Sequence, residues 1–184
     1  LGDVYKRQIQ EQGAGAAERA AKALGAYASQ LQTVGVVGDE VTLAGMAQLG
    51  TFQMTEDQIK TVSAGMLDLL VNQKGLNATQ EDAVNVANMI GKVMMGNVGA
   101  LQRVGISLDD YQKNIIKTGT ADERAAMIAE VLAQNVGGVN EAMRKTDAGQ
   151  AAAIMNDYGD MQEEVGKRLN KVRTGIMTAF AGLI

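Results

Sequence analysis

Five pairs of adjacent acidic residues are the groups in this 184-residue chain with the clearest potential for chemistry. Neighbouring carboxylates can hold a metal ion or act as a general acid and base. However, a hydroxyl residue stands one or two positions before four of the five pairs. A hydroxyl oxygen accepts the free N–H groups of a first helical turn, where the helix dipole also favours carboxylates. The pairs therefore indicate helix starts rather than reactive groups. They are Asp39-Glu40, Glu56-Asp57, Glu81-Asp82, Asp109-Asp110 and Asp122-Glu123.

The residues that follow these hydroxyl groups support the same interpretation. In a capping box, a Ser or Thr side chain and the side chain three positions later each accept the other residue's backbone N–H. Two of the four sites have this spacing in full, and two are weaker matches in which Asp stands at the third position. The full matches are Thr55 with Gln58 and Thr120 with Glu123; the weaker ones are Thr79 with Asp82 and Ser107 with Asp110.

The composition removes most other routes to catalysis. The chain has no His and no Cys, which excludes the usual zinc sites, disulfides, His-assisted nucleophiles and a near-neutral proton shuttle. Gly91-Lys92 lacks the earlier glycine and the following Ser or Thr of a phosphate loop. Gly13-Ala14-Gly15-Ala16 lacks the preceding strand of a dinucleotide site, so we interpret it as a helix-entry loop. We expect no enzyme and no cofactor.

Two further clusters have structural interpretations. A methionine cluster lies on or beside an apolar helix face, which favours core packing over a soft-metal site. A group of acids near a helix start could hold a cation, but this spacing is more typical of solvated charge. We assign no catalytic, cofactor-binding or metal-ligating residue. The two clusters are Met89, Met94 and Met95, and Asp157, Asp160, Glu163 and Glu164.

The charge and hydropathy of the chain limit its partners. Its 17 basic and 21 acidic residues give a net charge of −4, which argues against general binding of nucleic acid phosphate by this segment. No apolar run approaches the roughly 18 residues of a membrane span, and no signal peptide is recognisable. We expect a soluble segment with no membrane span.

Helical periodicity without strand-like alternation predicts an all-α fold. Residues 14–145 are expected to form a compact array of short helices joined by glycine turns. Residues 1–13 are expected to be a non-native or disordered extension, and residues 146–184 a long helix that starts an extended coiled-coil-like region. The expected helices of the array are 14–34, 39–53, 56–73, 80–95, 98–104, 107–119, 121–136 and a turn or two through 144.

An apolar stripe runs along the last segment from Ile154 to Leu183. Its steps of four, three and four residues form an eleven-residue pattern, which keeps the stripe nearly straight or slightly right-handed. An unbroken helix from 147 to 184 would be roughly 57 Å long. Such a stripe needs a cover, either by folding back on the array or by self-association into a bundle. We expect a homo-oligomer formed through residues 154–183.

Both ends of the chain look artificial. Residues 1–8 resemble the translated read-through of a sequencing adapter, and the chain stops inside an apolar pattern at Ile184. We therefore expect the natural protein to be longer.

Several phrases resemble those of phage tail tape-measure proteins. The more specific ones are Gly96 to Ile106 (GNVGALQRVGI), followed by a phrase that begins at Thr146 and another that begins at Asn156. The resemblance covers roughly residues 30–175 and carries over no catalytic residue. The remaining phrases lie at 37–40, 49–53, 54–59, 66–68 and 123–126.

The resemblance implies a virion structural protein that acts in tail assembly and tail length determination, with a role in genome ejection. Family members are extended helical chains in the tail lumen, so tail tube and tail assembly chaperone proteins become the expected partners. The expected location is the virion tail, or the host cytoplasm during assembly. This chain departs from the family pattern because it has no Pro and because the segment before 146 is no continuous rod. That segment is therefore expected to be a docking or assembly module.

Two other function classes stay open. A helical adaptor or chaperone-like module could use the same stripe to bind a partner helix. An enzyme acting on cell-wall glycan would need two carboxylates facing each other across a cleft.

Overall fold

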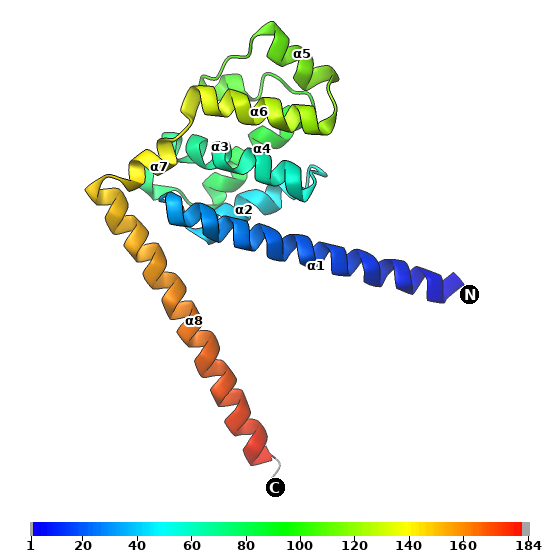
Figure 1. Ribbon diagram of the computed structural model, residues 1–184, viewed down its shortest axis with the longest axis vertical. Helices are drawn as coiled ribbons and strands as arrows, with labels where there is room; N and C mark the ends of the chain where they lie inside the picture. The colour runs from blue at the N-terminus through cyan, green and yellow to red at the C-terminus, as the bar shows by residue number, and fades with distance from the viewer. Residues whose placement is uncertain (1, 182–184) are drawn as a thin grey trace.

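The computed structural model describes the backbone of residues 2–181 and the side chains of residues 15–167. Within that part the chain is all-α, with eight α-helices, two short 3-10 helices and no strand, so the all-α part of the prediction is confirmed. Two long helices, α1 and α8, leave a body of shorter helices in different directions (Figure 1). The elements are α1 (Gly2–Val34), α2 (Asp39–Gly50), α3 (Glu56–Lys74), η1 (Gly75–Asn77), α4 (Gln80–Met94), η2 (Leu101–Val104), α5 (Asp110–Thr118), α6 (Ala121–Val136), α7 (Val139–Arg144) and α8 (Asp147–Ala181).

The first helix starts much earlier than the sequence indicated. Helix α1 begins at Gly2 and continues through Gly13 and Gly15, so the helix-entry loop predicted there is wrong. A glycine inside a helix costs up to about 1 kcal/mol, and the surrounding Ala residues are the strongest helix formers. Helix propensity summed over the segment therefore outweighs two isolated glycines.

Two other boundaries differ from expectation. Helix α5 begins at Asp110 rather than near Ser107, because the Asp109 side chain accepts the Gln112 backbone N–H at 2.7 Å and forms the cap. The predicted helix over 98–104 is only the 3-10 helix η2, which ends at Val104 and is followed by Gly105 with a φ of +82°. That left-handed backbone conformation is accessible to glycine at little cost.

Helices α3 and α6 lie side by side and run in the same direction. Near their starts Gln58 of α3 bonds Asp122 of α6, and further along Gly65 of α3 faces Leu132. A Cβ atom at Gly65 would lie 2.8 Å from the Cβ of Leu132, so glycine is what lets these two backbones approach. Parallel neighbours bring their positive ends together, and the acidic pairs at both starts offset that repulsion.

Helices α2 and α4 form a second close pair in the body. Gln48 of α2 donates to Asn88 of α4 at 2.8 Å, and the Phe52 ring packs where a Cβ of Gly91 would stand. The core between the helices consists almost entirely of aliphatic residues and methionine. Its largest fully buried side chains are Met46, Leu49, Met66, Leu67, Leu69, Leu70, Ile90, Leu101, Ile116, Ile128 and Leu132.

Candidate functional site

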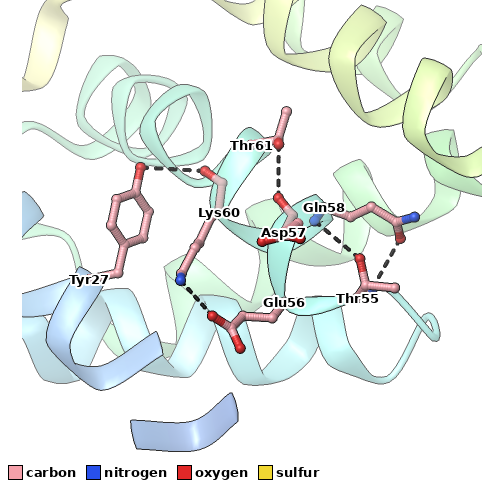
Figure 2. Close-up of polar contacts among 7 residues, drawn as sticks. All are labelled: Tyr27, Thr55, Glu56, Asp57, Gln58, Lys60 and Thr61. Carbon is pink, nitrogen blue, oxygen red and sulfur yellow. Dashed lines mark hydrogen bonds and ion pairs between the residues drawn. The ribbon is translucent and has the colours of Figure 1, made fainter. Parts of the chain in front are cut away.

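The acidic pairs lie at helix starts, as the sequence predicted. At the start of α3, the Gln58 backbone N–H donates to the Thr55 hydroxyl at 3.3 Å and the Thr55 N–H donates to the Gln58 side chain at 3.0 Å (Figure 2). The first pair, Asp39-Glu40, opens α2 after Gly38, which supplies no side-chain cap. Full capping boxes also start α4, α5 and α6, formed by Thr79 with Asp82, Asp109 with Gln112, and Thr120 with Glu123.

The Glu56 carboxylate takes part in a contact that fastens α1 to α3. Lys60 forms an ion pair with Glu56 at 2.5 Å, and its ammonium lies 6.0 Å from the centre of the Tyr27 ring of α1. The hydrogen bond that the Lys60 ammonium donates to Glu56 raises the pKa of Lys60. The Tyr27 hydroxyl donates to the Lys60 carbonyl at 3.5 Å, as Figure 2 shows. These groups therefore serve helix packing.

The same use of acids appears at α4 and α6. The Asp82 carboxylate pairs with Lys74 at 2.8 Å and accepts from Thr79, which together lower the pKa of Asp82 to about 2. Hydrogen bonds from the Thr120 backbone and side chain lower the pKa of Glu123. A carboxyl group used as a general acid near neutral pH needs a raised pKa, so both shifts run the wrong way for that role.

A pocket of about 420 Å³ opens between the starts of α3 and α6. Two acidic residues line it: Asp57 from the acidic pair of α3 and Asp122 from the acidic pair of α6. However, Asp122 accepts a 2.7 Å hydrogen bond from Gln58, whose own side chain closes the capping box of α3. The polar groups on this wall tie two parallel helices together, so their arrangement is that of a structural contact.

The acids of α8 separate into two environments. Asp160 lies with Asp39 and Glu40 of α2, with carboxylate oxygens within 4.8 Å of one another. Glu163 and Glu164 line a neighbouring hollow of about 250 Å³ with Ser29, Asp39, Asp160 and Lys167. Asp157 instead lines a different hollow with Arg144, Gln150, Ala153 and Ile154. The four acids that the sequence analysis considered as a possible cation site are therefore divided between two hollows.

The methionines of the predicted cluster have separate roles. Met94 is buried in the core and Met89 packs against it at partial burial, while Met95 is largely exposed. The structure therefore places two of the three in or beside the core and leaves the third on the surface.

A network of polar residues, which the sequence did not reveal, joins α1, α3 and α7. The Asp68 carboxylate of α3 accepts the backbone N–H groups of Gly138 and Asn140 at 3.0 and 2.8 Å, which caps the start of α7. The Asn140 side chain accepts the Val36 N–H at 2.9 Å. Arg144 donates to the carbonyls of Gln32 and Gly35, at the negative end of α1. This network fixes α7 and thereby the point at which α8 begins.

Helix α8 docks on the body through a largely polar face. Asn156 donates to the Val36 carbonyl at 3.1 Å, and Gln32 donates to the Asp160 carboxylate at 2.6 Å. Ala153, one turn before Asn156, is buried on the same side. The inner face of α8 thus makes specific hydrogen bonds rather than a hydrophobic contact.

The apolar residues of α8 point the other way. Ile154, Tyr158, Met161 and Val165, here called the outer stripe, are 66, 50, 54 and 50% exposed. Folding back of this part of the stripe onto the array, one of the two covers considered above, is therefore wrong. The rest of the predicted stripe, from Leu169 to Leu183, lies outside the residues whose side chains are described. The outer stripe is the strongest candidate for a functional surface on the described part of the chain.

Comparison with other proteins adds no family assignment. No family model, curated protein or solved structure matches this chain. Among the described residues, no helix combines the length and apolarity that crossing a membrane requires.

Proposed function

We propose that this chain is a structural, non-enzymatic segment of a phage tail tape-measure protein. It acts in tail assembly and tail length determination, with a role in genome ejection. The observation that carries the proposal is the outer stripe, because an apolar face directed away from its own domain is an interaction surface. The resemblance of residues 30–175 to tape-measure proteins then gives that surface a context.

The shape of the molecule supports a division of roles. Helices α1 and α8 have 33 and 35 residues, so each is about 50 Å long. In this proposal α8 starts the rod that measures length, and the body is a docking or assembly module for tail tube or tail assembly chaperone proteins. The protein would then be found in the virion tail, and in the host cytoplasm during assembly.

The use of the acidic residues supports a protein without catalysis. The pairs that could have formed an acid–base site cap helices, tie α3 to α6 or pair with lysines. The pKa values of Asp82 and Glu123 are lowered, whereas the general acid of a glycan-cleaving enzyme of the usual kind needs a raised pKa.

The proposal is tested by changing the length of α8 in the phage gene that contains this sequence. Inserting three eleven-residue repeats after Val165 preserves the stripe, and tails measured by electron microscopy should lengthen by about 50 Å. Deleting a helix pair from the body should instead prevent normal assembly. Unchanged tail length after the insertion would contradict the ruler role, and normal tails that shorten in proportion to a body deletion would contradict the docking role.

A helical adaptor or chaperone-like module is the second candidate, favoured by the same outer stripe. It predicts that the insertion leaves tail length unchanged, while substitution of Met161 by Asp abolishes binding of a partner helix. The tail-length measurement separates the two functions.

A further inference from the structure

The charges of α8 are sorted along its length. Residues 157–164 contain four acidic side chains and no basic one, whereas residues 167–173 contain four basic side chains and no acidic one. Within one helix such sorting gains only the contacts across the boundary, of which the Glu163–Lys167 pair at 2.5 Å is an example. Between two helices it sets their direction, because opposite charges lie side by side only when the helices run antiparallel.

The apolar pattern has a matching symmetry around Val165. Counted backwards from Val165, apolar residues stand at four, seven and eleven positions, and counted forwards they stand at the same three distances. Backwards these residues are Met161, Tyr158 and Ile154; forwards they are Leu169, Val172 and Ile176. A two-fold axis through Val165 therefore brings each of these six apolar positions level with another of them.

The outer stripe is accessible to a second helix. Its four residues are at least half exposed, while Ala153, Asn156 and Asp160 occupy the opposite side of α8 against the body. A second helix that lies along residues 154–165 of the stripe therefore does not collide with the body of the chain that carries the stripe. In an antiparallel pair the two bodies would stand at opposite ends of the paired helices.

We propose that two copies of this chain pair antiparallel through α8, with the two-fold axis at Val165. Ile154 of one copy lies level with Ile176 of the second, Tyr158 with Val172, and Met161 with Leu169. The acidic stretch 157–164 of each copy lies alongside the basic stretch 167–173 of the other, and the two helix dipoles also oppose each other favourably. Each copy then covers the stripe of the other.

A parallel pair would cover the same apolar residues but would place acid beside acid and base beside base. Like charges at close range cost energy, so the parallel arrangement is disfavoured by those charged residues of the two stretches that do not face the body, as Asp160 does. An unrelated partner helix would not require the symmetry of the stripe about Val165. The sequence thus favours a second copy as the occupant and antiparallel as its direction.

This pairing rests on α8 itself and holds whether or not the proposed tail function is correct. Copies that lie along a tail in a common direction cannot keep it. If the proposed tail function is correct, the antiparallel dimer is the state of the chain before tail assembly, and the two copies must separate when the rod forms. Failure of the pairing would leave the tail-length experiment unaffected, and the reverse also holds.

The first test is the mass of the full chain in solution. Light scattering after size exclusion, at concentrations on the order of 10 μM, should give twice the 19.4 kDa of one chain. Val165→Asp places two carboxylates at the axis and should give the monomer mass. The matched control Gly159→Asp adds the same charge to an exposed position of α8 off the stripe, where a new Cβ meets no neighbour, and should stay dimeric.

The second test uses cysteine crosslinking to determine the relative direction of the two helices. The chain has no native cysteine, so only the introduced residues can react. In the antiparallel pair two copies of residue 154 lie about 33 Å apart, since 22 residues separate position 154 from position 176. Ile154→Cys alone and Ile176→Cys alone should therefore resist a short bis-maleimide crosslinker, while an equal mixture of the two variants should crosslink. Crosslinking of Ile154→Cys alone would show a parallel pair and overturn the proposal.

Two other results would also overturn it. One is a monomer mass for the unsubstituted chain, which would assign the stripe to a different protein. The other is a Val165→Asp variant that remains dimeric with unchanged helical circular dichroism, which would place the contact elsewhere on the chain.

Discussion

The helices of the body and helix α8 are both amphipathic, but they turn their apolar faces in opposite directions. In the body, from α2 to α7, leucine, valine, isoleucine and methionine fill a common core and the charged residues mark helix starts. In the described part of α8, hydrogen bonds attach the polar face to the body and the apolar face meets solvent. The body therefore buries its own apolar faces, whereas α8 is positioned by the body and leaves its described apolar face exposed.

The largest difference between the two regions is expected when one apolar side chain is truncated in each. Leu132→Ala empties a fully buried site against α3 and should lower the free energy of unfolding by about 2–5 kcal/mol. Val165→Ala, measured at a concentration where the chain is monomeric, should change it by less than about 0.5 kcal/mol. Urea unfolding followed by circular dichroism compares them directly, and equal losses would mean that α8 is covered by its own body.

A second test concerns the network that positions α8. Asp68→Ala leaves the Gly138 and Asn140 N–H groups without their acceptor and should cost about 1–3 kcal/mol. Asp110→Ala is the control, since that side chain is fully exposed and makes only a surface ion pair with Lys113. If the Asp68 variant were as stable as the Asp110 variant, the Asp68 network would not be what holds α8 in place.

A third test addresses the side-chain caps that begin the helices of the body. Thr120→Ala removes one half of a capping box and should cost about 1 kcal/mol. Ser107→Ala should be nearly neutral, because Asp109 caps α5 and Ser107 makes no capping bond. Thermal unfolding measures the loss of stability in the two variants. A larger loss in the Ser107 variant would indicate that α5 begins at Ser107, as the sequence suggested.

These caps show where sequence is informative. A cap and its box lie within four residues, so Thr55, Thr79 and Thr120 could be recognised from local spacing alone. At α5 two candidates stand two residues apart, and local spacing did not choose between Ser107 and Asp109. The box formed with Gln112 made that choice in the fold.

The contacts that position the outer stripe could not be found in this way. Asp68 and Asn140 are 72 residues apart, and Gln32 and Asp160 are 128 apart, so no local pattern joins them. Periodicity identified which residues of α8 share a face but not whether that face points inward. The direction depends on α7, whose own position depends on Asp68 and Arg144.

The smallest effect is expected from acid titration, which should separate an ion pair of the body from one of α8. The pKa of Asp82 is lowered to about 2, first by Lys74 and then by Thr79, from 3.8 in the unfolded chain. Because the folded value is the lower one, the stabilisation is fully present above about pH 4 and is lost as the pH falls through 2. In Lys74→Met the NMR titration midpoint of Asp82 should move upward but stay below 3.8, since the bonds from Thr79 remain.

Lys167→Met is the matched control, because Lys167 pairs with Glu163 inside α8 and does not join two elements of the body. It should leave the Asp82 midpoint and the acid stability of the body unchanged, since an exposed ion pair within one helix contributes little to stability. If Lys167→Met instead lowered acid stability as much as Lys74→Met did, charges on α8 would be stabilising the body. The stability of the body would then depend on α8, although the apolar faces of the two regions point in opposite directions.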